Sequence, residues 1–352
     1  MKVCRILLIL LLLATASALV AQSVKGPKKD AGTNVPISTS TSSDSKPADK
    51  ADSTPHASPL SIDVDLVNVD VVVTDRDGNP VTGLTKKDFK VFDDNVEQNL
   101  TMFAPTDSPL TMVLLLEFGD TFGYWFDDVV QPAAGFINSL RPDDWAALMA
   151  YDLRPEILVD FTKNKNELYD GLRRLQIPAY REICLYDAVW DTLDRLDNID
   201  GKRAIFLLST GLDTISKHSY PDLLKKAQAS DTMIYPLSMG QEARMYFESM
   251  GSMSGERDIT FATADNVLRS LAEASGGTAF YPKFQAEFPG IFQMVSTHLR
   301  NEYSLGFVPT NRKTDGKFHK LRVEVPPLDN HDGKKPIKLT VKHKQGYYAP
   351  KS

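Results

Sequence analysis

The spacing of hydrophobic positions along this 352-residue chain changes near residue 110 and again near residue 302. Between these points, apolar runs of strand length alternate with segments in which apolar residues recur every three to four positions. The runs are Leu110–Phe118, Ala204–Leu208 and Met233–Leu237. Such runs are typical of strands buried on both faces, and the segments between them are typical of amphipathic helices. The pattern predicts an α/β fold with a doubly wound, mostly parallel sheet.

Two shorter apolar segments in this region are close enough to form a hairpin. Trp145–Tyr151 and Ile157–Phe161 are separated by five residues, which predicts one antiparallel strand at the edge of the sheet. Helices are expected at 127–140, 166–175, 185–196, 221–229, 267–274 and 284–300, and a short strand at 278–281.

The regions on either side of this α/β part alternate as half-buried strands do. Valine occupies every second position from Val67 to Val73, and three further strands are expected after residue 302. Neither flank is large enough to bury a core by itself. We therefore expect the 61–106 segment and the 302–352 segment to form one β-sandwich around an inserted 107–301 domain. Two separate β modules are the alternative.

The first 60 residues follow neither pattern. Lys2 and Arg5 precede the apolar run Ile6–Leu13, and small residues follow it, which predicts a secretory signal peptide over residues 1–21. The run is too short to span a bilayer, which needs roughly 20 residues. Residues 22–60 are rich in Ser, Thr, Pro and Lys, which predicts a disordered tether. We expect an exported protein, periplasmic or extracellular, with no transmembrane segment after cleavage.

Composition narrows the classes of function. The formal net charge is -6, so nucleic-acid binding, which needs a basic face, is not expected. Without the signal peptide Cys184 is the single cysteine, and its apolar neighbours predict a buried thiol. Asp187 and Asp191 fit a solvated helix face better than a catalytic pair, and the histidines lack the spacing of zinc motifs. An enzyme is not expected; an uncharacterised hydrolase is a distant alternative.

Several segments of the chain resemble the von Willebrand factor A family. In the α/β part they are LLLEFGDT, CLYDAVWDTL and RAIFLLSTGLDTIS. The flanks resemble the acidobacterial type of secreted von Willebrand factor A-related proteins, in DVDLVNVDVVVTDRDGNPVTGLTKKDFKVFDD, YSLGFVPTNRKTDGKFHKLRVEV and QGYYAP. The resemblance covers about residues 63–350. It implies a doubly wound α/β domain used for adhesion or assembly, and no known reaction.

The resemblance also implies a metal-ion-dependent adhesion site at the carboxyl ends of the sheet strands. In that family, Asp-x-Ser-x-Ser, a Thr on a second loop and an Asp on a third loop supply oxygen ligands for magnesium. The matching positions here are Glu117, Gly119, Thr121, Ile183 and Thr210. Only Glu117 and Thr121 keep a ligating group, so we expect a degenerate site and no cofactor. Magnesium held by non-standard ligands is the alternative.

Other residues expected at this edge suggest a surface for a protein partner. Residues 240–266 are predicted to be a long loop, and such loops are usually functional or disordered. Aromatic and Arg side chains are enriched in binding hot spots, and methionine-rich surfaces adapt to varied partners. The candidates are Phe122, Tyr124, Trp125, Tyr180, Arg181, Met245 and Phe247. The alternative for the first-loop aromatics is that they pack the first helix onto the sheet.

Together these observations predict an exported protein–protein interaction or adhesion module. Because the implied metal site is degenerate, we expect binding that does not depend on a metal. A divalent-metal-dependent adhesion domain with unusual ligands is the alternative. The sequence does not identify the protein partner.

Overall fold

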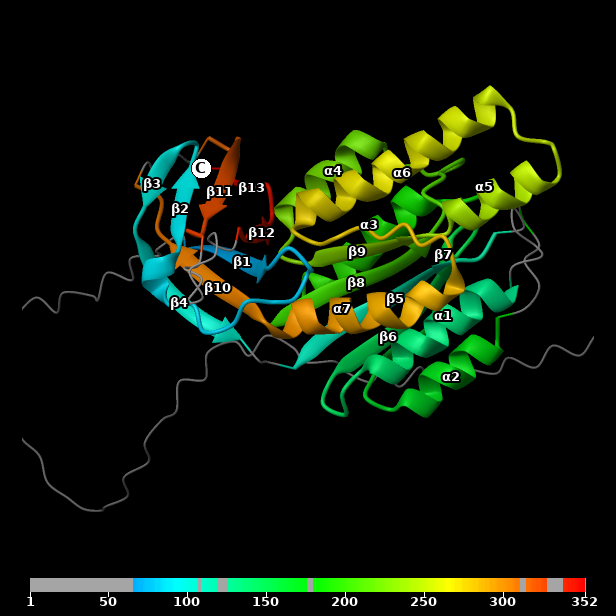
Figure 1. The fold of residues 1–352 in the computed structure, drawn as a ribbon, viewed down its shortest axis with the longest axis horizontal. Helices are drawn as coiled ribbons and strands as arrows, with labels where there is room; N and C mark the ends of the chain where they lie inside the picture. Colours follow the sequence, from blue (N-terminus) through cyan, green and yellow to red (C-terminus); the bar gives the residue numbers. More distant parts are fainter. Residues whose placement is uncertain are drawn as a thin grey trace, which may run out of the picture.

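The computed structural model describes residues 66–106, 109–119, 126–175, 180, 182–310, 315–327 and 338–351. The predicted signal peptide and tether lie outside the described residues, as do Thr121, Phe122, Tyr124, Trp125 and Arg181. The described strands form three sheets, and helices gather around one of them (Figure 1).

The central sheet has five strands in the order β7-β6-β5-β8-β9. Strands β6, β5, β8 and β9 run parallel, and β7 pairs antiparallel with β6 at the edge. The predicted mixed sheet with one antiparallel edge strand is therefore confirmed. The strands are β5 (Leu110–Glu117), β6 (Trp145–Tyr151), β7 (Pro155–Thr162), β8 (Lys202–Ser209) and β9 (Met233–Ser238).

Helices cover both faces of this sheet, which explains why every residue of β5 and β9 is buried (Figure 1). One face packs against α1 (Phe126–Ser139), α2 (Lys165–Arg173) and α7 (Phe288–Arg300). The other packs against α3 (Leu185–Leu196), α4 (Tyr220–Ala229) and α6 (Gly255–Ser275). Cys184 lies in this second core and is 1% exposed, so the predicted buried thiol is confirmed.

The prediction of a long loop over residues 240–266 is wrong. The segment forms α5 (Gly240–Ser249) and the first half of α6, with Gly251 at a φ of 61° between the two helices. It is rich in Ala, Glu, Arg and Met, which favour helix. The strand expected at 278–281 is reduced to a bridge between Phe280 and Leu237. No helix among the described residues combines the length and apolar character needed to cross a membrane.

Two antiparallel sheets of four strands each combine strands from both ends of the chain. Their orders are β12-β1-β10-β4 and β13-β11-β2-β3. Buried side chains of both sheets, such as Val71, Val91 and Leu305, meet in one cluster. The two flanks of the α/β part therefore pair strand by strand. The strands are β1 (Val67–Thr74), β2 (Lys90–Asp93), β3 (Val96–Gln98), β4 (Leu100–Thr106), β10 (Glu302–Phe307), β11 (Phe318–Glu324), β12 (Thr340–His343) and β13 (Gly346–Tyr348).

Candidate functional site

Glu117 ends β5 at the position of the first implied metal ligand, and its side chain is buried. The carboxylate accepts hydrogen bonds from the Ser209 hydroxyl at 2.7 Å, the Thr210 amide at 2.9 Å and the Thr210 hydroxyl at 2.8 Å. The Tyr151 hydroxyl lies 3.3 Å from the same carboxylate. Burial raises the pKa of Glu117, although these hydrogen bonds oppose the shift. The buried carboxylate of Glu117 thus joins the ends of β5, β6 and β8 through hydrogen bonds.

Ile183 lies on the loop before α3, and its side chain packs against Gly119 at the carboxyl edge of the central sheet. Its side chain is 1% exposed, and a Cβ atom added to Gly119 would lie 3.1 Å from its Cγ1 atom. The isoleucine therefore fills the space into which a serine at residue 119 would project. The Ile183 amide donates to the Thr214 hydroxyl at 2.7 Å, and the Thr214 amide donates to the Ile183 carbonyl at 2.8 Å. The second loop is thereby joined to the loop that follows β8.

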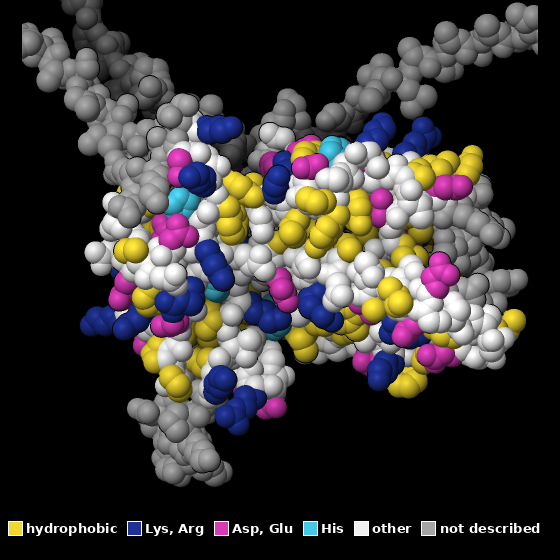
Figure 2. Space-filling view, turned by 90° about the horizontal axis from the view of Figure 1, so that it is seen from above, with side chains coloured by type: hydrophobic (Ala, Val, Ile, Leu, Met, Phe, Trp, Pro, Cys, Tyr) yellow, Lys and Arg dark blue, Asp and Glu magenta, His cyan; other side chains and the backbone are white. Residues whose placement is uncertain are grey.

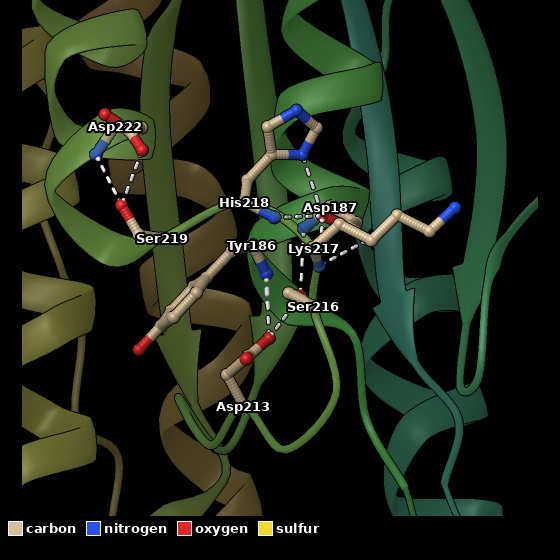
Figure 3. Close-up of polar contacts among 8 residues, drawn as sticks. All are labelled: Tyr186, Asp187, Asp213, Ser216, Lys217, His218, Ser219 and Asp222. Atoms are coloured by element: carbon tan, nitrogen blue, oxygen red, sulfur yellow. Dashed lines mark hydrogen bonds and ion pairs between the residues drawn. The ribbon is translucent and has the colours of Figure 1, made fainter.

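The loop after β8 also caps the start of α3 (Figure 3). Asp213 accepts a hydrogen bond from the Tyr186 amide at 3.1 Å, and the Ser216 hydroxyl accepts one from the Asp187 amide at 3.1 Å. The N-cap residue of α3, Cys184, makes no such bond with its side chain. Because the first amides of a helix need acceptors from outside the helix, these contacts stabilise both the helix and the loop.

The described residues at this edge offer few free oxygen ligands for a magnesium ion. Magnesium requires near-octahedral oxygen ligands at about 2.0–2.1 Å. Both oxygens of Glu117 already accept hydrogen bonds, Ile183 offers no ligating atom, and the Thr210 hydroxyl donates to Glu117. Among the described residues, hydrogen bonds and apolar packing join the end of β5, the loop before α3 and the loop after β8.

A His–Asp pair lies beside this edge and was missed by the sequence analysis. The Asp187 carboxylate lies 2.7 Å from Nδ1 of His218 and accepts the amides of Lys217 and His218. The imidazole stacks on Trp190 with 4.1 Å between the ring centroids. The expected solvated face therefore holds for Asp191, which is exposed, but is wrong for Asp187, whose carboxylate binds the loop.

The hydroxyls of Ser216 and Ser219 do not form a Ser–His–Asp arrangement with this pair. The Ser216 hydroxyl donates to Asp213, and the Ser219 hydroxyl donates to Asp222 at 2.6 Å. Figure 3 shows the second ring nitrogen of His218 pointing away from both serines. Neither hydroxyl is therefore placed to pass its proton to the imidazole, which a serine nucleophile would require.

Three of the predicted partner-binding residues are described. Tyr180 and Met245 are 50% and 41% exposed. Phe247 is half-buried and packs against Phe261 of α6, with 6.1 Å between the ring centroids. Tyr180 and Met245 are thus available at the surface, whereas Phe247 also joins α5 to α6.

The pair of helices α5 and α6 carries further exposed apolar side chains. Met250 follows α5 and is 64% exposed, and Ile259 on α6 is 70% exposed. The α5 helix begins two residues after β9 ends, and in Figure 1 it lies at the end of the molecule farthest from the antiparallel sheets. Figure 2 shows hydrophobic side chains at the surface toward this same, right-hand end.

No protein family model matches the chain, and no curated protein sequence matches it. Among solved structures, the conserved hypothetical protein BatB from Bacteroides thetaiotaomicron is 9% identical with a TM-score of 0.39, over 54% of this chain and 98% of its own. The vWF domain of the type V pili tip protein Mfa5 from Porphyromonas gingivalis is 14% identical with a TM-score of 0.39, over 54% and 96%. A von Willebrand factor type A structure from Catenulispora acidiphila is 10% identical with a TM-score of 0.43, over 75% and 73%. Likenesses at this level assign no function.

Proposed function

We propose that this chain is an exported protein–protein interaction or adhesion module whose von Willebrand factor A-like domain binds its partner without a metal ion. The observation that carries the proposal is the position of Glu117. Its buried carboxylate is bound by Ser209 and Thr210 at the place where a metal-dependent relative would hold its ion. The strand order of the central sheet and the segments LLLEFGDT and RAIFLLSTGLDTIS support the domain assignment.

The exposed apolar side chains support binding by apolar contact. Met245, Met250 and Ile259 lie on or between α5 and α6, which follow the carboxyl end of β9. Tyr180 lies on the loop before α3. Exposed apolar side chains mark a protein-binding surface where they form one contiguous patch, and the proposal is that these side chains do so. A protein partner, and no chemical reaction, is the function that these side chains support best.

In the proposed organisation, a signal peptide exports this domain and a β-sandwich formed by the flanking segments packs beside it. Residues 1–21 form a signal peptide and residues 22–60 a tether. The 61–106 and 302–352 segments form a β-sandwich around the inserted 107–301 domain. The pairing of β1 with β10 and of β2 with β11, together with their shared buried cluster, supports this arrangement.

A comparison of surface variants tests the proposal. The full mature chain is immobilised, and proteins captured from the envelope fraction of the source cells are quantified for wild type, a Met250→Asp/Ile259→Asp double variant and Met102→Asp. Met102 lies on β4 and is 37% exposed, so Met102→Asp is a matched control on a different part of the surface. We expect wild type and the Met102→Asp control to capture a partner protein that the double variant does not capture. The amount captured should not change when magnesium is added.

Two results would count against this function. Equal recovery of the partner protein by wild type and the double variant would show that the partner does not bind the α5–α6 surface. Recovery that depends on added magnesium and is lost in Glu117→Ala would favour the metal-dependent alternative.

A further inference from the structure

A group of ionisable side chains lies in the second antiparallel sheet, away from the carboxyl edge of the central sheet. Asp93 ends β2, Asp94 begins the turn to β3, and His319 lies on the neighbouring strand β11. One ligand atom of each side chain lies within 4.8 Å of the other two. Asp93 and His319 are buried, and the Asp94 side chain is 49% exposed. The group therefore joins two buried side chains to one that is half exposed.

Each carboxylate uses one oxygen for the protein and turns the other toward the imidazole. Oδ2 of Asp93 accepts the Tyr347 hydroxyl at 2.9 Å, and Oδ1 of Asp94 accepts the Lys320 amide at 3.0 Å. Their remaining oxygens, Oδ1 of Asp93 and Oδ2 of Asp94, both lie 3.2 Å from Nδ1 of His319. Two oxygens are thus held at equal distances from a nitrogen that carries at most one proton.

Two of the three spacings in this group are close to those between the ligand atoms of a tetrahedral metal site. Zinc binds histidine nitrogen and carboxylate oxygen at about 2.0–2.2 Å, so neighbouring ligand atoms in a tetrahedron lie roughly 3.3–3.5 Å apart. The 3.2 Å distances from Nδ1 of His319 to Asp93 and to Asp94 are close to this value. Small movements of the side chains would bring the three atoms to bonding distance around one ion.

The surrounding side chains supply the outer partners that such sites have. Oδ1 of Asp315 lies 4.0 Å from Nε2 of His319, on the side of the ring opposite the two aspartates. Metal-binding histidines commonly direct their second ring nitrogen toward a carboxylate, and metal-binding carboxylates are themselves hydrogen-bonded. Tyr347 has this second role at Asp93, because its hydroxyl donates to Oδ2 of the carboxylate.

The charges of the group also favour a cation. Three carboxylates, those of Asp93, Asp94 and Asp315, surround a single imidazole. In the described part of the chain, the ion pairs recorded for these carboxylates are those with His319. Like charges held close together repel one another, and a bound divalent cation would offset this repulsion.

We propose that Asp93 Oδ1, Asp94 Oδ2 and His319 Nδ1 bind a divalent transition-metal ion, and that zinc fits the three donors best. The fourth position opens toward the exposed side of Asp94. Because Asp93 and His319 are 226 residues apart, the ion joins a strand that precedes the α/β part to one that follows it. Its effect would be to hold the two flanks together, independently of Glu117 and the partner-binding edge.

Metal titration of the full mature chain tests this site. The protein carries no histidine tag, is stripped with a chelator and dialysed, and is then titrated with zinc by calorimetry and with cobalt by visible absorption. We expect one zinc ion per chain and the absorption bands of four-coordinate cobalt.

Three variants locate the site. Asp94→Asn keeps the acceptor for the Lys320 amide and tolerates the positive φ of 47°, so we expect it to fold and to lose zinc affinity at least tenfold. Asp170→Asn removes a comparably exposed carboxylate on α2 and should leave the affinity unchanged. Glu117→Gln, which alters the other edge, should also leave zinc binding unchanged.

The proposal is overturned if the stripped chain binds no zinc stoichiometrically, or if folded Asp94→Asn binds zinc as tightly as wild type. Loss of zinc binding in Glu117→Gln with retention in Asp94→Asn would also overturn it. In each of these cases His319 acts as an ion-pair partner of the aspartates without a metal.

Discussion

Replacement of Glu117 by alanine tests whether the carboxylate ties the strand ends together as the hydrogen bonds indicate. Glu117 is buried and accepts the Thr210 amide and the hydroxyls of Ser209 and Thr210. In Glu117→Ala these donors lose their acceptor in a place that water does not reach. We therefore expect a large loss of stability from a single change at the proposed binding edge.

The size of the loss follows from the groups left behind. The Thr210 amide is held by the backbone, and a buried donor without an acceptor costs about 1–3 kcal/mol. The hydroxyls of Ser209 and Thr210 can rotate toward other acceptors and cost less. The buried methylene that alanine lacks contributes about 0.8 kcal/mol. We expect the free energy of unfolding to fall by about 2–4 kcal/mol.

Urea unfolding at pH 7, followed by far-ultraviolet circular dichroism, measures this loss. Glu117→Gln keeps one carbonyl oxygen for the Thr210 amide, so it should lose about half as much or less. Glu97→Ala removes an exposed glutamate on β3 and should change the free energy of unfolding by no more than about 0.5 kcal/mol. A loss below about 1 kcal/mol in Glu117→Ala would refute the structural role of this carboxylate.

Three further experiments test the buried ionisable groups. Burial raises the pKa of Glu302 from 4.5 to about 8, so the stability that its protonated form contributes is lost as pH rises between these values. In urea unfolding, the free energy of unfolding of wild type relative to that of Glu302→Gln should therefore be larger at pH 5 than at pH 8. An equal difference at the two pH values would contradict this. Burial raises the pKa of the Cys184 thiol to about 12, so a thiol-reactive dye should not label the folded chain at pH 8. Labelling at the rate of an exposed thiol would show that this thiol is not buried. Asp144 is buried and pairs with Arg300 at 2.6 Å, so Asp144→Ala should lower the free energy of unfolding by about 3–5 kcal/mol. A loss under about 1 kcal/mol would show that the pair contributes little to stability.

Much of the fold could be predicted from the sequence because burial leaves a simple pattern. A strand covered on both faces is a near-continuous apolar run, and β5 and β9 fit this apart from Thr111, Glu117 and Ser238. The helix α5 and the first half of α6 escaped prediction because Met245, Met250 and Ile259 remain exposed, which blurs the periodicity of a buried face. Helix propensity was the remaining signal in that segment.

The sites were less predictable because they depend on contacts between distant parts of the chain. The family pattern placed Glu117 and Thr210 at the same edge, but the hydrogen bonds of Glu117 to Thr210 and Ser209 follow from the parallel pairing of β5 with β8. Asp93 and His319 meet through the register of β2 against β11, which no spacing along the sequence encodes. Histidine spacing alone therefore gave no indication of the proposed zinc site.

Calorimetric titration of the full mature chain with magnesium and manganese tests the central claim most directly. Wild type and Glu117→Ala are compared under the same conditions, after each is shown to be folded by circular dichroism. If hydrogen bonds and packing replace the metal at this edge, wild type will show no submillimolar binding that depends on Glu117. Submillimolar binding of either ion that Glu117→Ala abolishes would contradict the claim.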